Sequence, residues 1–519
     1  MRDKTTLTLP ALKTTEQWEK VYSIGLLLVV LVGIGLRLAY VNRPLDHRLR
    51  SPWRQADYVQ IARNFYRGDM NIFYPQIDWR EDTPGYVEAE FPFLPWTGAL
   101  LYRVFGYHEE ILRVLSAVLG IASLLLFLAL CHKFLPPIGT LFAVAAFAVN
   151  PLLMHLATAM QPEPVMLFLS LIAVALIWRW DERPNFANLL LASAIIAAAA
   201  LAKAPAAYLG LLLAYAVLRK FGLKALRDVR IYVAALVCIL PPLAWHVWAA
   251  RFWLDYGNSL GLSNGQHFIG WDMLLPPTFL IGILKWETLG VFTPAGWLLV
   301  LAAFRQPRAE IEFFLVWYGA VWVFYIVAGR TTAADWAYYY HSASIVPGYL
   351  LMGAGFAAFV QGKVIPKKYA WLARHEKSLG GLLAVGTLVA LIGATVVFVR
   401  LRDGRTDLLK MRTCGLEFAK NLPPTEMIVV TGGYKFDEFG NPGAYNVSMM
   451  FAWMDRKGFN YGIEELGIET LDRLAMRGGR YWIAHRSELE RDNLKALVNQ
   501  RYRLVAECSL GYYLYDLKS

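Results

Sequence analysis

The sequence predicts an α-helical membrane protein that crosses the membrane many times and ends in a small α/β domain outside the membrane. Hydrophobic residues make up 57% of the 519 residues, and the mean hydropathy is positive, as soluble domains seldom show. The apolar residues gather in repeated runs of roughly 17–23, which is the length of a membrane-spanning helix. After residue 400 the pattern changes, because short helical and strand-like stretches alternate there.

Eleven apolar runs predict membrane-spanning helices. The first, Val21–Val41, is too long for the core of a signal peptide and lacks a small-residue cleavage site, so we expect it to remain as a helix. A further segment, Pro276–Phe292, reads as a span, a re-entrant piece or an interfacial helix, so the expected number is eleven give or take two. The other ten predicted spans are Ile111–Cys131, Ile138–Ala157, Pro164–Trp180, Ala187–Ala202, Ala204–Leu218, Tyr232–Ala250, Leu289–Phe304, Phe313–Ala328, Ile345–Phe359 and Gly380–Val399.

The basic residues predict the orientation in the inner (plasma) membrane. Lys4, Lys13 and Lys20 precede the first span, which places the amino terminus in the cytoplasm. An odd number of spans then places the tail, residues 401–519, on the extracytoplasmic side. The net charge of +11 does not indicate a nucleic-acid partner, because the bases fall in short clusters between alternate spans and not in one patch. These clusters are Lys133, Arg179/Arg183, Arg219/Lys220/Lys224/Arg227/Arg230, Arg305/Arg308 and Lys363/Lys367/Lys368/Arg374/Lys377.

The first outer loop, residues 42–110, is long and densely charged, which favours a functional role over a simple connection. Residues 42–91 hold seven Arg, eight Asp or Glu and no Lys. Ser51 followed by Pro52 is a helix-start signal. From there an apolar stripe and a polar side with Arg54, Asp57 and Gln60/Arg63 predict a helix lying on the membrane surface. A second interfacial helix is expected from Pro92 to Phe105.

The tail predicts a small α/β domain. Its expected helices are Met411–Asn421 and Ser487–Asn499, and its expected strands are Met427–Thr431, Tyr481–Ala484, Arg503–Glu507 and Tyr512–Asp516. Gly432-Gly433 follows a strand, where a plain turn is the commoner outcome and a phosphate-binding turn the rarer one. Cys414 and Cys508 form a disulfide if the compartment is oxidising, and two free thiols are the alternative.

The order of motifs in residues 20–400 resembles the family 39/83-type glycosyltransferases, which include protein mannosyltransferases and the aminoarabinose transferases of lipid A. In that family an acidic residue followed by Tyr and Ala lies in the first outer loop, as Asp57, Tyr58 and Ala62 do here. A Pro-containing loop and a helix ending in Phe-Gly follow, here Phe91–Leu94 and Phe105-Gly106. The later matching segments are MQPEPVMLFLSLIAVAL, ALAKAPAAYLGLLL and AYYYHSASIVPGYLLMGAG.

The resemblance implies the GT-C fold over residues 1–400 and a sugar donor carried on polyprenyl phosphate. The sequence shows no Walker or dinucleotide fingerprint, so we expect no cofactor. The acceptor is a hydroxyl of a glycan, a lipid or a protein, with membrane lipid as a further partner. The chain departs from the lipid A enzymes at Phe91-Pro92-Phe93, where they have Lys-Pro-Pro, so another cation must meet the donor phosphate. The resemblance does not extend to the tail.

Transfer from such a donor needs a base for the acceptor hydroxyl, and a single displacement would invert the anomeric configuration. Asp57 is the leading candidate for the base, and a solvated residue or an ion pair with Arg54 is the alternative. Glu90 is the second catalytic candidate, with local pairing to Arg80 or another Arg as its alternative.

The departing phosphate needs cationic partners. The candidates are Arg54, Lys203, Lys285, Arg330 and His341. Lys203 and Glu163 lie at the edges of apolar runs, where charges are costly and usually functional. Their alternative is mutual pairing or extension to the interface. The remaining substrate-binding candidates are Tyr58, Glu88, Glu163, Tyr339 and Tyr340, and the two late tyrosines can equally form an interfacial aromatic belt.

The histidines are scattered and show no zinc-ligand spacing, so we assign no metal site. A metal held by two carboxylates of the first outer loop is the alternative. The main alternative function is a lipid or sugar transporter or flippase, which would share the intramembrane charges. A non-catalytic scaffold that works through the tail is a second alternative. Replacing Asp57 by Ala separates these functions, because only an enzyme should lose turnover while staying folded.

Overall fold

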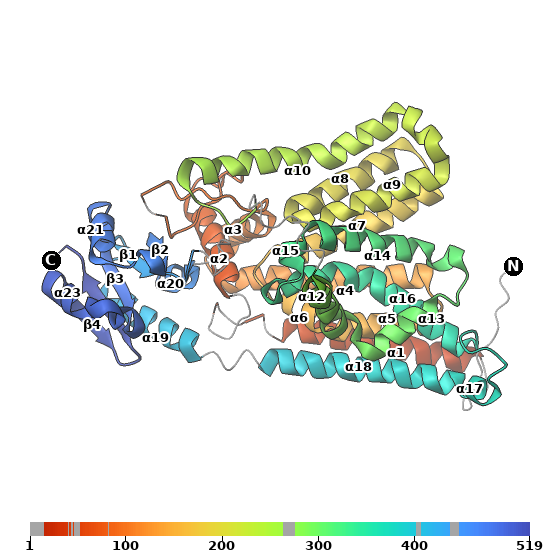
Figure 1. Ribbon diagram of the computed structural model, residues 1–519. Helices are drawn as coiled ribbons and strands as arrows, with labels where there is room; N and C mark the ends of the chain where they lie inside the picture. Colours follow the sequence, from red (N-terminus) through yellow and green to blue (C-terminus); the bar gives the residue numbers. More distant parts are fainter. Residues whose placement is uncertain are drawn as a thin grey trace.

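The computed structural model describes residues 15–39, 41–42, 45, 52–80, 82–262, 276–400, 406–435 and 446–518. The long helices run side by side, and a small sheet domain stands at one end of the bundle (Figure 1). Helices α2 (Pro52–Arg67) and α3 (Phe93–Phe105) lie between the bundle and this domain. Both were predicted from the first outer loop, and α2 begins at the expected Pro52.

Within the described residues, nine helical segments are long and apolar enough to span a membrane, and two shorter apolar helices accompany them. This agrees with the predicted count of about eleven and makes the chain a multi-pass membrane protein. The helices are α1 (Thr15–Leu38), α4 (Glu110–Phe134), α5 (Pro137–Val149), α7 (Glu163–Glu182), α8 (Phe186–Ala202), α9 (Tyr208–Phe221), α10 (Val229–Tyr256), α12 (Pro277–Trp286) with α13 (Thr293–Ala303), α14 (Arg308–Val327), α16 (Ser342–Val360) and α18 (Glu376–Arg400).

The segment that the sequence left open forms the start of a span. Helix α12 continues through a π-helical turn, η4 (Glu287–Phe292), into α13, and together they make one apolar segment, Pro277–Ala303. π-Helical turns interrupt the regular hydrogen-bond ladder and are frequent at functional sites. Two carbonyls of this turn are satisfied from outside it, since Asn150 donates to Gly290 O at 2.8 Å and Tyr349 donates to Val291 O at 3.0 Å.

Helix α16 is the central helix of the bundle, and it is buried along almost its whole length. It passes so close to α13 that a Cβ atom at Gly355 would lie 1.7 Å from the Leu299 carbonyl oxygen. Small residues allow such backbone contact between membrane helices, where packing and not water drives association. Helices α1, α10 and α18, in contrast, expose many Leu, Ile and Val side chains, as lipid-facing helices do.

Helix α2 differs from the expectation of a surface helix, because nearly all its residues from Pro52 to Phe65 are buried. Its polar side faces protein. Gln60 donates to Ser448 O at 2.7 Å and Arg63 donates to Ala452 O at 3.2 Å. Both acceptors belong to α20 (Ser448–Met454) in the tail. The tail domain therefore covers the face that the sequence assigned to solvent.

The tail forms a five-stranded sheet in the order β2-β1-β3-β5-β4. Strand β1 (Met427–Thr431) runs parallel to β2 (Gly458–Tyr461) and β3 (Gly479–His485), whereas β5 (Tyr512–Asp516) is antiparallel to β3 and to β4 (Arg503–Cys508). All four predicted strands are present, and β2 was not predicted. The helices are α19 (Thr406–Asn421), α20, α21 (Ile468–Met476), α22 (Arg486–Leu489) and α23 (Leu494–Arg501).

The predicted helix Ser487–Asn499 is broken into α22 and α23. Asn493 adopts a left-handed conformation, φ +59°, immediately before α23. Asparagine tolerates this conformation better than most residues, so the interruption has a local cause.

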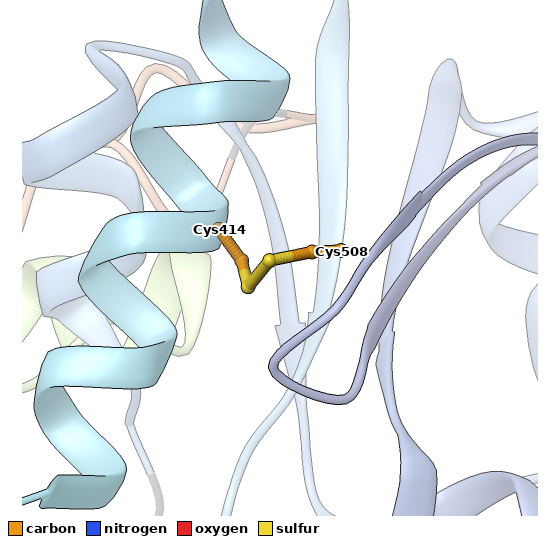
Figure 2. Close-up of a disulfide and its surroundings, with 2 residues drawn as sticks. All are labelled: Cys414 and Cys508. Atoms are coloured by element: carbon orange, nitrogen blue, oxygen red, sulfur yellow. A yellow bond between two sulfur atoms is a disulfide. The ribbon is translucent and has the colours of Figure 1, made fainter.

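A disulfide connects two elements within the tail domain, and main-chain hydrogen bonds connect this domain to the first outer loop. A disulfide joins Cys414 of α19 to Cys508 of β4 (Figure 2). Residues 78–80 of the loop approach the exposed edge of β2, where Gly458 N donates to Asp78 O at 2.8 Å and Asn460 N to Trp79 O at 3.4 Å. An uncovered edge strand invites pairing with other chains, and here the first loop covers it.

Candidate active site

Seven of the candidate site residues predicted from the sequence lie close together beside α2. At their centre is a cluster of four charged side chains, Arg54, Glu90, Glu163 and Lys203, which we call the ionic cluster. Arg54 Nη2 lies 2.8 Å from Glu90 Oε1 and 3.7 Å from Glu163 Oε1. Lys203 Nζ lies 3.1 Å from Glu90 Oε1 and 2.8 Å from Glu163 Oε1. Each cation therefore contacts both carboxylates.

Local sequence places Lys203 and Glu163. Helix α8 ends at Ala202 because Pro205, two residues past Lys203, cannot continue it. Lys203 is thus left in an extended conformation at the helix end. Glu163 opens α7, where the first turn favours a negative charge. The ion pair expected between Lys203 and Glu163 is present. Arg54 and Glu90 extend this pair to the four-residue ionic cluster.

Glu90 is carried to the cluster by main-chain contacts on either side of it. Phe91 N donates to Leu201 O, near the end of α8, at 3.1 Å. Trp245 of α10 donates from its indole nitrogen to Ala89 O at 2.9 Å. The local pairing considered from the sequence is present with Arg54 of the same loop and not, among the described residues, with Arg80. Glu90 also pairs with Lys203.

Three tyrosines line the ionic cluster. Tyr58 donates from its hydroxyl to Glu90 Oε2 at 2.6 Å, and Arg54 donates from Nη1 to the Tyr339 hydroxyl at 3.0 Å. The Lys203 ammonium lies 5.2 Å from the centre of the Tyr339 ring and 5.1 Å from that of Tyr340, within the range of cation–π attraction. These tyrosines contact charged groups of the ionic cluster.

The ionic cluster is close to electrically balanced, with two cations against two carboxylates. Glu163 and Lys203 are buried, whereas the Glu90 side chain keeps 14% of its surface exposed. Burial by itself raises the pKa of Glu90, but Lys203, Arg54 and the Tyr58 hydroxyl together lower it well below its usual value. A carboxylate stabilised in this way is a weak proton acceptor. Glu90 and Arg54 are the partly exposed members of the cluster, with 14% and 11% of their side chains exposed.

Asp57 lies one helical turn from Arg54, outside the ionic cluster. Its carboxylate is buried and accepts a hydrogen bond from the Trp79 indole nitrogen at 3.1 Å. Burial raises the pKa of Asp57 to about 7, although Trp79, the Ser448 hydroxyl and Arg54 each act to lower it. A carboxyl group with a pKa near the working pH is well matched to general-base catalysis.

Glu88 lies apart from the ionic cluster. Its carboxylate accepts a hydrogen bond from the Ser259 hydroxyl. Its main chain pairs with the segment after α10, since Glu88 N donates to Asn258 O at 3.0 Å and Leu260 N donates to Glu88 O at 2.8 Å. Glu88 thus connects the first loop to this segment, and these contacts do not support the predicted role in binding substrate.

Two of the five predicted phosphate ligands are held by other partners, and a third is not described. Lys285 forms a half-exposed ion pair with Asp335 at 2.7 Å. His341 is buried, with Nδ1 2.8 Å from Glu287 Oε1 and Nε2 3.0 Å from Thr332 O. Because both ring nitrogens already have partners, this geometry does not support phosphate binding by His341. Arg330 belongs to α15 (Gly329–Thr332), and its side chain lies outside the described residues.

Sequence reasoning missed two residues beside Asp57, namely Trp79 and Ser448. Trp79 is buried in the loop that covers β2, and a tryptophan between Asp78 and Arg80 in a charged loop was a usable signal, because a buried indole nitrogen needs an acceptor. Ser448 lies 391 residues beyond Asp57 in a segment with no motif, so nothing local indicated it. Among the residues that the structure describes, no group of three or more His, Cys, Asp or Glu side chains is placed to hold a metal ion.

Comparison with known proteins relates the chain to membrane glycosyltransferases. Residues 84–248, which include Glu90, Glu163 and Lys203, match the family described as dolichyl-phosphate-mannose-protein mannosyltransferase. No curated protein matches the chain by sequence.

Solved structures match almost the whole chain. ArnT from Cupriavidus metallidurans aligns in its apo state with a TM-score of 0.55 and bound to undecaprenyl phosphate with 0.57, each at 15% identity over 97% of this chain and 98% of ArnT. The oligosaccharyltransferase AglB from Archaeoglobus fulgidus, in complex with an inhibitory peptide and dolichol phosphate, aligns with 0.56 at 12% identity over 96% of this chain and 74% of AglB.

At these identities the structural matches establish the fold, and the family match adds the sequence relationship. Both agree with the resemblance inferred from the sequence motifs. The chain is thus a membrane protein of the GT-C glycosyltransferase fold, related over residues 84–248 to the dolichyl-phosphate-mannose-protein mannosyltransferase family.

Proposed function

We propose that the chain transfers a sugar from a polyprenyl-phosphate-linked donor to an acceptor hydroxyl at the outer side of the plasma membrane. The observation that carries this proposal is the meeting of Arg54 and Lys203 with Glu90 and Glu163 beneath α2, at the end of the bundle next to the tail domain. Buried cations at the edge of membrane-spanning helices are costly and are usually retained for function. The family match and the fold support the choice of donor.

Arg54 and Lys203 are the groups that meet the donor phosphate in this proposal. The lipid A enzymes carry a lysine in the first loop where this chain has Phe91, and Lys203 lies 3.1 Å from the neighbouring Glu90. Both cations already pair with carboxylates, so the phosphate must compete with Glu90, which, like Arg54, is partly exposed. This competition weakens donor binding, while the two cations stay desolvated and oriented for the phosphate.

Asp57 is the proposed general base. The acceptor hydroxyl gives its proton to the Asp57 carboxylate while its oxygen forms a bond to the anomeric carbon. The bond between that carbon and the phosphate oxygen breaks at the same time, and the electron pair leaves on polyprenyl phosphate. One displacement of this kind inverts the anomeric configuration. Glu90 is the weaker choice for the base because Arg54, Lys203 and Tyr58 stabilise its ionised form.

The outer location rests on two independent features. Lysine and arginine clusters between alternate spans indicate which connections are cytoplasmic. The Cys414–Cys508 disulfide in the tail is typical of an oxidising compartment, whereas cytosolic thiols stay reduced.

We also propose that residues 1–400 form the transferase and that residues 401–519 form a separate domain that covers α2.

Replacing Asp57 by Asn tests the proposal directly. The purified chain is placed in lipid nanodiscs with a synthetic undecaprenyl-phosphate sugar and with a glycan, a lipid or a peptide as the hydroxyl acceptor, and release of undecaprenyl phosphate is followed. Loss of a general base typically costs about 10²–10⁴ in rate, so kcat should fall by that amount while the KM for the donor changes little. Asp69→Asn, on the exposed part of the same loop, is the control and should leave the rate unchanged.

Near-normal turnover by Asp57→Asn would remove Asp57 from the mechanism. A folded protein that never releases undecaprenyl phosphate but moves the intact donor between leaflets would instead indicate a transporter or flippase, for which Asp57 is dispensable.

A further inference from the structure

The tail domain contains a cavity that the proposed chemistry does not use. It has a volume of about 250 Å³ and opens at the carboxyl ends of the parallel strands β1 and β3. Its lining includes Thr431 and the Gly432-Gly433 pair after β1, and His485 at the end of β3. In open α/β sheets ligands bind outside the carboxyl ends of the strands, so the cavity occupies the expected place for a ligand.

Several polar side chains line this cavity. Glu488 of α22 accepts from the His485 main-chain nitrogen at 3.2 Å, and the Thr431 hydroxyl lies against the same carboxyl group. The Tyr512 side chain belongs to the lining, and its ring centre lies 4.9 Å from that of His485. A carboxyl, a hydroxyl, a phenol and an imidazole thus face one small space.

The rest of the lining is largely apolar and includes Met411, Val430, Met450 and Ile483. None of the described residues that line it is a lysine or an arginine, so it does not suit a phosphate or a carboxylate. A monosaccharide has the matching properties, because its hydroxyl groups pair with carboxyl and hydroxyl side chains while its C–H face packs against apolar and aromatic groups. The volume is sufficient for about one sugar ring.

Helix α20 connects this cavity to the proposed active site. Val447, just before α20, and Met450 line the cavity. Between them, Ser448 donates from its hydroxyl to Trp53 O at 2.7 Å on α2, and its hydroxyl also lies against Asp57. The cavity and the proposed base are therefore on opposite sides of one short helix.

We propose that the cavity lined by Thr431, His485, Glu488 and Tyr512 binds one sugar residue of a glycan acceptor and holds the acceptor beside α2. The proposal rests on the proposed transferase function and narrows its acceptor to a glycan. Burial raises the pKa of Glu488 to about 7, so this carboxyl group is ionised in a large fraction of the protein at neutral pH and then accepts hydrogen bonds from sugar hydroxyls as a charged group.

The test measures sugar binding to the full chain in lipid nanodiscs that contain no glycoside detergent. The probes are the methyl glycosides of glucose, galactose, mannose, arabinose and N-acetylglucosamine, followed by saturation-transfer NMR and calorimetric titration at pH 7. We expect saturable binding of at least one glycoside. Glu488→Gln should weaken that binding by about tenfold or more, as loss of a hydrogen bond to a charged group does, and the exposed neighbour variant Glu490→Gln should not.

Glutamine also serves in the capping position that Glu488 occupies, so the variant should fold, and its thermal midpoint checks this. Tyr512→Phe keeps the ring and gives a second measurement that does not depend on the cap. Absence of binding by every glycoside, or binding that both variants leave unchanged, would overturn the proposal. Asp57→Asn should lower turnover by about 10²–10⁴ without altering sugar binding, so failure of the transferase mechanism and failure of the sugar site are seen separately.

Discussion

At the scale of single residues, the contacts of Glu90 decide between two roles that the sequence could not separate, namely general base and partner of the two cations. Its carboxylate accepts hydrogen bonds from Arg54, Lys203 and Tyr58, so it neutralises the cations before the donor arrives. A residue with this role restrains phosphate binding and does not accept the acceptor's proton.

Glu90→Gln should therefore strengthen donor binding. The amide keeps the shape and one oxygen, but the ionic cluster gains a net positive charge that attracts phosphate. We expect the Kd of undecaprenyl phosphate to fall by about tenfold, or ~1.4 kcal/mol, a fraction of the attraction between close charges near a protein surface. Calorimetric titration in nanodiscs measures it. If Glu90 were the base, turnover would instead collapse by roughly 10²–10⁴.

Asp57 makes the reaction dependent on pH. Its pKa is raised to about 7, and only the ionised form can accept a proton, so kcat/KM should rise between about pH 6 and pH 8 with a midpoint near 7. The Trp79 indole N–H stabilises the ionised form. Trp79→Phe should therefore move the midpoint to higher pH and recover most of the rate in alkaline buffer.

Trp96→Phe is the matched control for this profile, because Trp96 donates its indole N–H to Met70 O at 2.8 Å and does not involve Asp57. An unchanged midpoint in Trp79→Phe would show that the indole does not act on the base. A profile that is flat from pH 5.5 to 9 in the unmodified chain would argue against any base with a pKa near 7.

At the scale of elements, α2 is held between the helical bundle and the tail domain by ion pairs of different burial. Arg63 lies 2.7 Å from Asp78, and both side chains are 3% exposed. Arg67 lies 2.7 Å from Asp455, with 53% and 43% of the two side chains exposed. Buried and exposed pairs differ strongly in the cost of losing one partner.

Asp78→Asn should thus destabilise the chain far more than Asp455→Asn. The first change removes the fully buried partner of Arg63 and leaves it with the half-exposed Asp455 carboxylate, 2.9 Å away, so it should cost about 3 kcal/mol, at the lower end of the range for breaking a buried pair. The second removes the half-exposed partner of Arg63 and Arg67 while Asp78 still compensates the buried Arg63 charge, so it should cost about 1 kcal/mol. Asparagine also tolerates the left-handed conformation of Asp455, φ +52°. Thermal midpoints of the purified variants compare them, and equal losses would contradict the assignment.

At the scale of the whole molecule, the proposed orientation determines which compartment the active site faces. Single cysteines at the exposed positions Glu469 in the tail and Lys367 in the connection after α16 provide the test. A membrane-impermeant maleimide should label Glu469→Cys without permeabilising the inner membrane, and Lys367→Cys only after permeabilisation. The reverse result would place the tail domain and the ionic cluster on the cytoplasmic side.

The sequence was sufficient for features that depend on nearby residues. The length of an apolar run decides whether a helix spans the membrane, and all eleven predicted spans have a counterpart among the described helices. Strands β1 and β5 have the predicted bounds because alternating and apolar patterns mark them locally. The short strand β2 was missed, because four residues, Gly458–Tyr461, carry too little pattern to be recognised.

Only the tertiary structure decided which of the predicted charges meet. Glu90 and Lys203 are 113 residues apart, and Arg54 and Tyr339 are 285 apart, so no local pattern distinguishes them from Lys285 or His341, whose partners are Asp335 and Glu287. The same holds for α2, whose polar side predicts a surface helix until the tail covers it. A charge at the edge of an apolar run marks a costly position, but its partner depends on how the helices pack.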